Sequence, residues 1–317
     1  MQTRTYGELF KLIRSLAGVG AFSSNELDDI ANLINRRFLQ IFNESPIWPR
    51  YLVSSEKRDV LALTLSGATA STDTTVNQNY KLLGSNTTGG SNVYQGATTS
   101  TVIIYNTGSA WRVDTAASAA EQTDGTFTVT SGTQQFIEAD TNKKDNITDV
   151  ETFTPRAGTD SLLVEGKNLV PFAQSGKTTI GSFNRIYRKQ PFLNQSALEY
   201  EFFVDVTGAN ILNIASTTDN SVFVTYKQQF TPFSVGPSTD ATIYIDSTVE
   251  VPGEFFAYLA HATYADFLRM DGQTDKAFQE EERANLALAL ELEKVDIISN
   301  NNTVNKRFST YVNRQSR

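Results

Sequence analysis

Few residues in this chain could perform acid–base or nucleophilic chemistry. His261 is the only histidine, and cysteine is absent. A Ser-His-Asp triad would have to use His261, but the sequence contains no G-x-S-x-G segment. Zinc sites draw on several Cys or His ligands, so no metal site is expected, and His261 is interpreted as a core or interface residue. Carboxylate pairs of the glycoside-hydrolase kind stay open, because the fold decides which acids meet.

Two other segments match ligand-binding loops only in part. The run GSNTTGGS, residues 84–91, lacks the Gly-Lys-Ser/Thr end of a phosphate-binding loop. The segment MDGQTDK, residues 270–276, lacks the alternating oxygen ligands of a calcium loop. We therefore predict that the protein has no cofactor and no catalytic residue, and that it is not an enzyme.

The overall charge limits the partners of the chain. It carries 27 Lys and Arg against 35 Asp and Glu, a net charge of −8. A protein that wraps DNA is usually basic, so this balance argues against wrapping. It is compatible with lining a channel through which DNA passes without sequence-specific binding. No run of about 18 apolar residues occurs, so no membrane-spanning helix is expected.

The C-terminal residues 297–317 have a different composition, with four bases and no acid. An asparagine run that starts at Asn300 is expected to end the preceding helix. Aromatic and apolar residues then recur at spacings of three and four, which a purely solubilising tail does not need. We predict an extended arm that orders on a partner supplying acids and apolar area. Its candidate binding residues are Lys306, Arg307, Phe308, Tyr311, Val312 and Arg314.

Two helices near the C-terminus give the strongest structural signal. Apolar residues recur at helical spacing over residues 253–270 and again over residues 277–295. Asp271 and Gly272 interrupt the pattern, because glycine readily adopts the positive φ of a helix end. The sequence therefore predicts an αα-hairpin.

The N-terminal region shows the same periodicity. Residues 5–17 and 25–42 are predicted helices, and Ser23 with Glu26 matches a capping box at the start of the second. Prolines stop this helix, and Trp48 between them is expected to plug the end of the helical core.

Arg36 and Arg37 are expected on the exposed side of the second helix. Two interpretations stay open, a solvated helix face and a contact between neighbouring subunits. The candidate subunit-interface residues are Arg36, Arg37, Phe267 and Arg269.

The sequence in the middle of the chain is typical of short β-strands. Residues 67–176 are rich in Ser, Thr, Gly and Asn, which predicts a small inserted β module. Longer strands flank it and are expected to pair as one sheet. The predicted fold class is α+β, with an N- and C-terminal helical bundle packed on an antiparallel sheet. The predicted division is a core of residues 1–66 and 177–296, the module at 67–176 and the arm at 297–317.

Several motifs resemble head-to-tail adaptor (connector) proteins of tailed bacteriophages. The N-terminal helices of that family resemble YGELFKLI, SSNELDDIANLINRRF and WPRYLV, and the last helices resemble VPGEFFAYLAHA and YADFLRMDGQTDKAFQEEERA. Between them, RIYRKQPF, LEYEFF and SVFVTYKQQFTPF resemble the strand region before those last helices. The resemblance covers both ends of the chain, and the inserted module departs from the shortest members of the family.

The resemblance implies a structural virion protein at the head–tail junction, made in the host cytoplasm. It implies a homo-oligomeric ring of twelve copies that joins the portal protein to the tail nozzle or tube protein and continues the DNA channel. The C-terminal arm is then expected to dock on the portal. A DNA-facing arm is the rival, because its four bases also suit phosphates.

The β module leaves a second function open for the protein. YKLLGSN, SNVYQG, TVIIYN and AWRVD resemble small β modules of secreted, adhesive and phage structural proteins, some of which bind sugars. Tyr94, Tyr105 and Trp111 are interpreted as the core of this module, with a sugar-stacking platform as the alternative. That alternative implies a tail-associated carbohydrate-binding or host-attachment protein.

Overall fold

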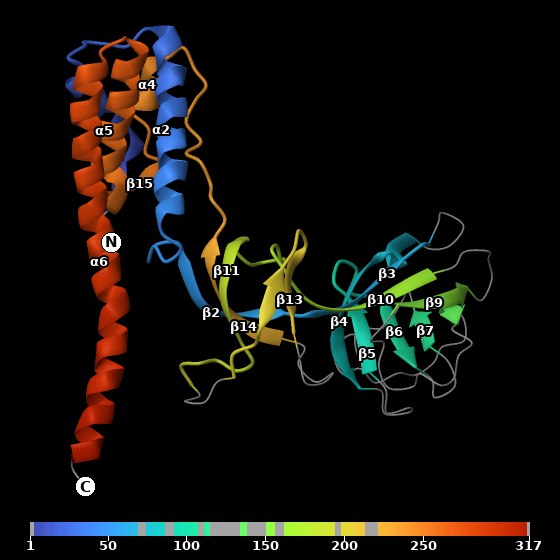
Figure 1. Ribbon diagram of the computed structural model, residues 1–317. Helices are drawn as coiled ribbons and strands as arrows, with labels where there is room; N and C mark the ends of the chain where they lie inside the picture. Colours follow the sequence, from blue (N-terminus) through green and yellow to red (C-terminus); the bar gives the residue numbers. More distant parts are fainter. Residues whose placement is uncertain are drawn as a thin grey trace. The chain divides into compact units, whose positions relative to one another are not determined.

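The computed structural model describes residues 3–68, 74–85, 92–106, 111–114, 134–137, 150–155, 162–193, 198–212 and 221–315. Side chains from residue 298 onward, and those of several strand residues, lie outside this description. The chain divides into a helical unit, Met1–Leu52 with Gln229–Arg317, and a β unit, Val53–Gln228 (Figure 1). Helices and antiparallel sheets are both present, as the predicted mixed fold class requires.

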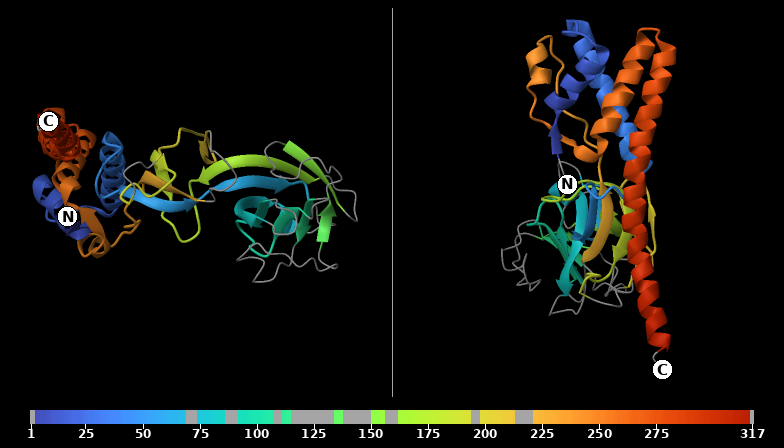
Figure 2. Two further views of the ribbon diagram at one scale, coloured as in Figure 1. Left: turned by 90° about the horizontal axis from the view of Figure 1, so that it is seen from below. Right: turned by 90° about the vertical axis from the view of Figure 1, so that its left-hand side faces the viewer.

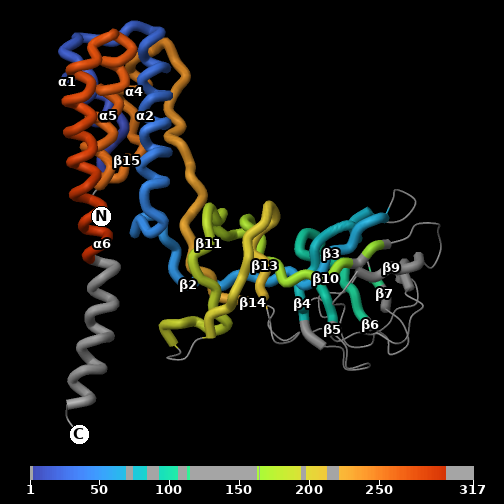
Figure 3. Tube along the Cα trace, in the orientation of Figure 1, coloured from blue at the N-terminus to red at the C-terminus, as the bar shows by residue number. Residues whose placement is uncertain are grey.

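Both ends of the chain build the helical unit (Figure 3). Its elements are β1 (Thr3–Thr5), α1 (Tyr6–Ala17), α2 (Ser24–Glu44), α4 (Ala241–Ile245), β15 (Glu250–Pro252), α5 (Gly253–Met270) and α6 (Thr274–Gln315). Helix α5 packs on α1, α2 and α6, and β1 pairs antiparallel with β15. The N- and C-terminal helices therefore form one bundle.

Capping side chains fix where the first two helices begin. The Thr5 hydroxyl accepts the Glu8 backbone N–H at 3.1 Å, and Glu8 accepts the Thr5 N–H at 3.2 Å. At the start of α2, Glu26 accepts the Ser23 N–H at 2.7 Å. These contacts satisfy amides that a helix start would otherwise leave without partners. The capping box predicted at Ser23 is confirmed.

A single apolar cluster fills the helical unit and joins α1, α2 and α5. Phe38 stacks on Phe233 with ring centroids 4.4 Å apart. Trp48 is 2% exposed, and its indole N–H donates to the Ile41 carbonyl at 2.9 Å. Its ring meets Phe255 edge-on at 4.8 Å. Trp48 therefore lies in the helical core, as predicted from its place between two prolines.

Helices α5 and α6 form the predicted hairpin, and both views in Figure 2 show them side by side. Gly272, at φ +77°, provides the turn between them. The prediction of a helix break at Asn300 is wrong, because α6 continues to Gln315. Between Gln273 and the last residue the sequence has no glycine or proline, and asparagine alone lowers helix propensity only modestly. The expected extended arm is therefore part of a helix.

The described strands of the β unit form two sheets. Three strands are in the order β11-β14-β2, and ten are in the order β12-β13-β10-β3-β4-β5-β6-β7-β8-β9, with β9 also pairing with β10. The strands are β2 (Leu52–Asp59), β3 (Leu61–Ser66), β4 (Gln78–Ser85), β5 (Asn92–Gly96), β6 (Ile103–Asn106), β7 (Trp111–Asp114), β8 (Gln134–Ile137), β9 (Val150–Pro155), β10 (Leu162–Pro171), β11 (Ile180–Tyr187), β12 (Phe202–Val204), β13 (Gly208–Ile211) and β14 (Ser221–Gln228). A single 3-10 turn, η1 (Thr74–Val76), precedes β4.

The boundaries between the units differ from the predicted ones at residues 66/67 and 176/177. Strand β3 pairs with β10 and with β4, so it belongs to the same sheet as the predicted module. Leu63 and Leu65 pack there in one cluster with Tyr80 and Tyr94. The flanking strands β2, β14 and β11 do pair as one sheet, as expected, but they too lie within the β unit. The composition of the sequence indicated where the module lies, but the pairing of its strands determines where the β unit begins and ends.

Candidate protein interface

The most strongly bonded charged group in the helical unit joins α2 to the α5–α6 hairpin. Asp266 on α5 is 4% exposed. The Arg37 Nε donates to its Oδ2 at 2.6 Å, and the Arg37 Nη2 donates to its Oδ1 at 2.5 Å. Arg36 adds a bond to Oδ2 at 3.0 Å, and Arg269 adds one to Oδ1 at 3.1 Å. Glu281 on α6 also accepts from Arg269 and, at 3.4 Å, from Arg37.

These contacts keep the group ionised. Burial alone would raise the pKa of the Asp266 carboxyl, but the hydrogen bonds and charge of Arg37 outweigh burial and lower it. Burial would likewise lower the pKa of Arg37, and the Asp266 carboxylate raises it instead. A two-pronged arginine–carboxylate pair fixes the geometry of both partners, so this group, the arginine cluster, sets how α2 meets α5.

The four predicted interface residues fall into different positions. The expectation that Arg37 is exposed is wrong, because it is 8% exposed and bonded within its own chain. The side chain of Arg36 remains 59% exposed. Phe267 packs partly buried against the helical core and meets Phe22 edge-on at 5.6 Å. The Arg269 guanidinium lies 5.9 Å from the ring of Phe278, which is 66% exposed.

The rim of the cluster therefore consists of the exposed Arg36 and Phe278 and the half-buried Arg269. Asp266 and Glu281 were not among the predicted residues, although the sequence holds a signal for Asp266. It lies on the apolar face of α5 between Thr263 and Met270, where an ionised acid needs a cation. The subunit-interface role of Arg36, Arg37, Phe267 and Arg269 stays a prediction.

The predicted arm residues Lys306, Arg307, Phe308, Tyr311, Val312 and Arg314 lie within the backbone bounds of α6. Their side chains lie outside the described residues, so their role in binding also stays a prediction.

His261, the one histidine of the sequence, pairs with an acid inside the helical unit. His261 Nδ1 lies 2.7 Å from Glu280 Oε2, which joins α5 to α6. In the part of the chain that the structure describes, no three His, Asp or Glu side chains are placed to hold a metal ion. No helix among the described residues has the length and apolar character to cross a membrane.

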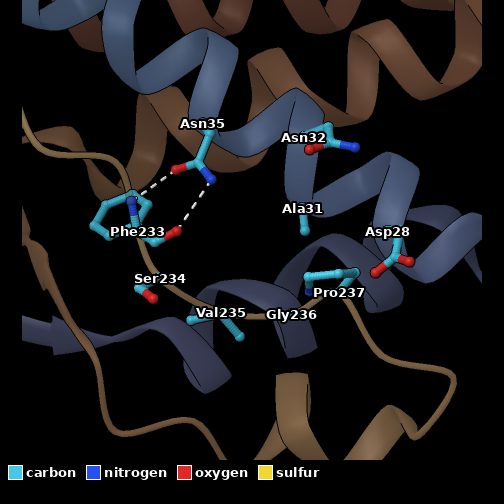
Figure 4. Close-up of a pocket in the computed structure, with 9 residues that line it drawn as sticks. All are labelled: Asp28, Ala31, Asn32, Asn35, Phe233, Ser234, Val235, Gly236 and Pro237. Carbon is cyan, nitrogen blue, oxygen red and sulfur yellow. Dashed lines mark hydrogen bonds between the residues drawn. The ribbon is translucent and has the colours of Figure 1, made fainter.

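A recess of about 320 Å³ lies between α2 and the segment 233–237 (Figure 4). The amide of Asn35 holds that segment by accepting the Phe233 N–H at 2.8 Å and donating to its carbonyl at 3.1 Å. At the other end, Asp28 Oδ1 accepts the Ser238 N–H at 3.1 Å and the Tyr244 hydroxyl. The lining residues are Asp28, Ala31, Asn32, Asn35, Phe233, Ser234, Val235, Gly236 and Pro237.

No known protein family, curated protein or solved structure matches this chain.

Proposed function

We propose that this protein is a structural virion component, a head-to-tail adaptor that joins a portal to a tail and continues the DNA channel. One observation carries the proposal. The N-terminal and C-terminal stretches that resemble adaptors are separated in sequence by the whole β unit, yet they fold into one helical unit with a common core. The helical motifs are therefore parts of one unit, whereas the strand segments of the resemblance lie mainly in the β unit.

The arginine cluster supports a role in assembly. It places Arg36, Arg269 and Phe278 at the surface where α2, α5 and α6 meet, held by Asp266. Arginine and aromatic side chains are enriched in protein interfaces. A ring of copies related by rotation needs two different faces on each subunit, and this rim supplies a candidate for one of them.

The partners in this proposal are the portal protein on one side of the ring and the tail nozzle or tube protein on the other. Twelve copies, the virion location and the portal-docking role of the C-terminal helix follow from the resemblance alone. The net charge of −8 suits a channel wall over which DNA slides. The sugar-binding alternative has less support, because Tyr94 and Tyr105 are 3% and 1% exposed and offer no stacking face.

The test is assembly with a portal. Native mass spectrometry and negative-stain images of the purified protein, alone and mixed with portal rings from the same virus, should show a closed ring seated on the portal. A trimer that ignores the portal and binds glycans on an array would contradict the proposal and favour host attachment.

The arm is tested by a double substitution, Phe308→Ala with Tyr311→Ala. Portal association should be lost while the melting temperature is unchanged, and Lys306→Gln with Arg307→Gln is the matched control for charge. If only the charge variant weakens association, and salt weakens the parent in the same steep manner, the helix end contacts DNA phosphates instead.

A further inference from the structure

The recess beside α2 has an apolar floor and a carboxylate at one end. Ala31, Val235 and Pro237 supply the floor. Figure 4 shows the Asp28 carboxylate pointing toward the segment 234–237, and its Oδ1 is the oxygen already bonded to the Ser238 N–H and the Tyr244 hydroxyl. Oδ2 is therefore the oxygen available to a further donor.

Asp28 is the one charged residue among those that line the recess. Asp240, which follows the lining segment in the sequence, is also acidic. The sequence has no lysine or arginine between Arg14 and Arg36, and none between Lys227 and Arg269. A long basic side chain fits such a place, because its methylene stem covers apolar floor while its charged head reaches a carboxylate.

Helix α6 carries a complementary face on its outer side. Leu286, Leu290 and Ile297 are 62%, 61% and 52% exposed. With about 100° of rotation per residue they fall within about 40° of one another. They lie opposite the buried side of the helix, which contains Ala277, Ala284 and Val295. A soluble surface helix usually has one apolar stripe, so this second stripe indicates a packing partner.

A basic row runs along one edge of that stripe. Lys276, Arg283 and Lys294 are exposed, and their spacing of seven and eleven residues keeps them on one line of the helix. The side chains of Arg283 and Lys294 are 62% and 64% exposed. Each forms an ion pair within α6, with Glu280 and Glu291 respectively. Exposed pairs of this kind contribute little and exchange readily.

We propose that the outer face of α6 docks on the α2 recess of a second copy, with Arg283 or a neighbouring base of the row entering beside Asp28. The inference rests on the proposed ring. Figure 1 shows α6 at one side of the helical unit and the segment leading toward α4 at the other, beyond α2. The two faces therefore differ in place, in charge and in shape, which is the heterologous contact that repeats by rotation and closes a ring.

Disulfide trapping tests this contact, because the chain has no cysteine of its own. In the full-length protein, Asn32→Cys places a thiol at the recess and Arg283→Cys places one on the basic row. The double variant should form a ladder of covalent oligomers on mild oxidation, whereas each single variant should stay monomeric on a denaturing gel. Asn285→Cys paired with Asn32→Cys is the matched control, since Asn285 is exposed on α6 and lies about 100° around the helix from Leu286, on the side away from the basic row.

Two results would overturn the docking proposal. Dimers from Arg283→Cys alone would mean that α6 pairs with α6 of another copy. A double variant with no ladder, while native mass shows an intact ring, would place the ring contact elsewhere and leave the proposed function standing. Absence of any ring and of portal binding in the parent would instead sink the proposed function.

A charge variant gives a second measurement without a thiol. Asp28→Asn keeps an oxygen that accepts from Ser238 and Tyr244 and removes only the charge. It should raise the protein concentration for half-assembly about tenfold, the size of one charge-assisted contact, with an unchanged melting temperature. Asp246→Asn, on the same unit but outside the recess, should leave assembly unchanged. Equal assembly of Asp28→Asn and parent would contradict the role of Asp28.

Discussion

The two units of this chain bury their apolar side chains in different arrangements. The helical unit gathers its apolar side chains into one cluster that includes residues from both ends of the chain. Among the residues that the structure describes, the core of the β unit falls into three clusters. The two units also differ in how completely their buried charged groups are bonded. Asp266 has three arginine partners in the helical unit. In the β unit, Arg58 is fully buried and bonds Glu56, Tyr226 and the Thr178 carbonyl, while its Nε and Nη1 make no hydrogen bond.

The contrast shows where cooperativity comes from in each unit. In the helical unit the two ends of the chain must meet before the core exists, so its parts depend on one another. In the β unit each strand relies on its neighbours in the ladder, and a cut through the ladder exposes the strands beside it.

The largest effect is expected from deletions made at two different pairs of boundaries. Replacing residues 53–228 with a short Gly/Ser linker should leave a helical unit that melts cooperatively. The chain leaves and re-enters that unit through β2 and β14, which are neighbours in one sheet, so a short linker spans the gap. Thermal unfolding followed by circular dichroism is the measurement.

Replacing residues 67–176, the bounds predicted for the inserted module, should instead give an aggregating protein. It removes β4 and β10, the partners of β3, and so exposes Leu63 and Leu65. A soluble, cooperatively melting product from this second deletion would show that the β unit is less interdependent than its ladder indicates.

Asp266→Ala should cost the helical unit about 3–5 kcal/mol, because it leaves Arg37 buried without its counter-charge. In a Trp111→Phe background, Trp48 is the single tryptophan and reports unfolding of the helical unit alone. Asp271→Ala, at the exposed hairpin turn, is the matched control and should change the free energy of unfolding by less than about 0.5 kcal/mol. Equal effects from both substitutions would mean that the arginine cluster does not hold α2 to α5.

Lowering the pH should remove part of the stabilisation that ionised Asp266 gives to the helical unit. The folded pKa of Asp266 is lower than its ordinary value of 3.8, so the unfolded chain takes up the proton first as pH falls. The stabilisation is complete above pH 3.8 and is lost as pH falls through the folded pKa. Denaturant titrations of parent and Asp266→Asn should converge toward low pH. Parallel curves would show that Asp266 does not titrate with folding.

Much of the helical unit could be predicted from the sequence, for local reasons. The periodicity over residues 253–270, the glycine at 272 and the capping box at Ser23 act within a few residues, and each is present in the structure. The helix end predicted at Asn300 is wrong, because asparagine is a weak stop signal without glycine or proline and α6 continues past it.

The limits of the β unit and the partner of Arg37 could not be predicted, because both depend on long-range pairing. β3 pairs with β10, which lies at the far end of the predicted module in the sequence, so composition placed β3 on the other side of the boundary from its partner. Arg37 bonds Asp266 far along the chain, and helical spacing alone placed it on an exposed face. The arginine cluster was therefore identified only in part, because its arginines were named and its acids were not, and its role as an interface stays a prediction.

For Gly7→Ala, helix propensity and packing predict opposite effects. We expect packing to dominate and the substitution to lower the free energy of unfolding by about 1–3 kcal/mol. Alanine is favoured over glycine inside a helix by about 1 kcal/mol, so propensity alone predicts a gain. A Cβ at Gly7 would collide with the Ile245 carbonyl of α4. Gly20→Ala is the control, because nothing lies within 4 Å of its Cβ position. Stabilisation by Gly7→Ala would mean that α4 moves aside at little cost.

The smallest effect concerns alkaline pH and the β unit. Burial lowers the pKa of Lys227 on β14 to about 8, from its ordinary value of 10.5. Between these two values the unfolded chain binds more protons than the folded chain, so the free energy of unfolding should rise with pH. A lysine stabilised by its charge would give the opposite slope, with stability falling as pH rises. The slope at Lys227 has the same sign as that at Asp266, where stability is lost as pH falls. Urea titrations from pH 7 to 9.5, followed by the fluorescence of Trp111 in a Trp48→Phe background, measure the slope. Lys227→Met should flatten it, and Lys189→Met, at an exposed loop position, should not. An unchanged slope in Lys227→Met would show that the β unit does not hold this lysine in a charge-disfavouring site, and the contrast in buried charge between the two units would then rest on Arg58 alone.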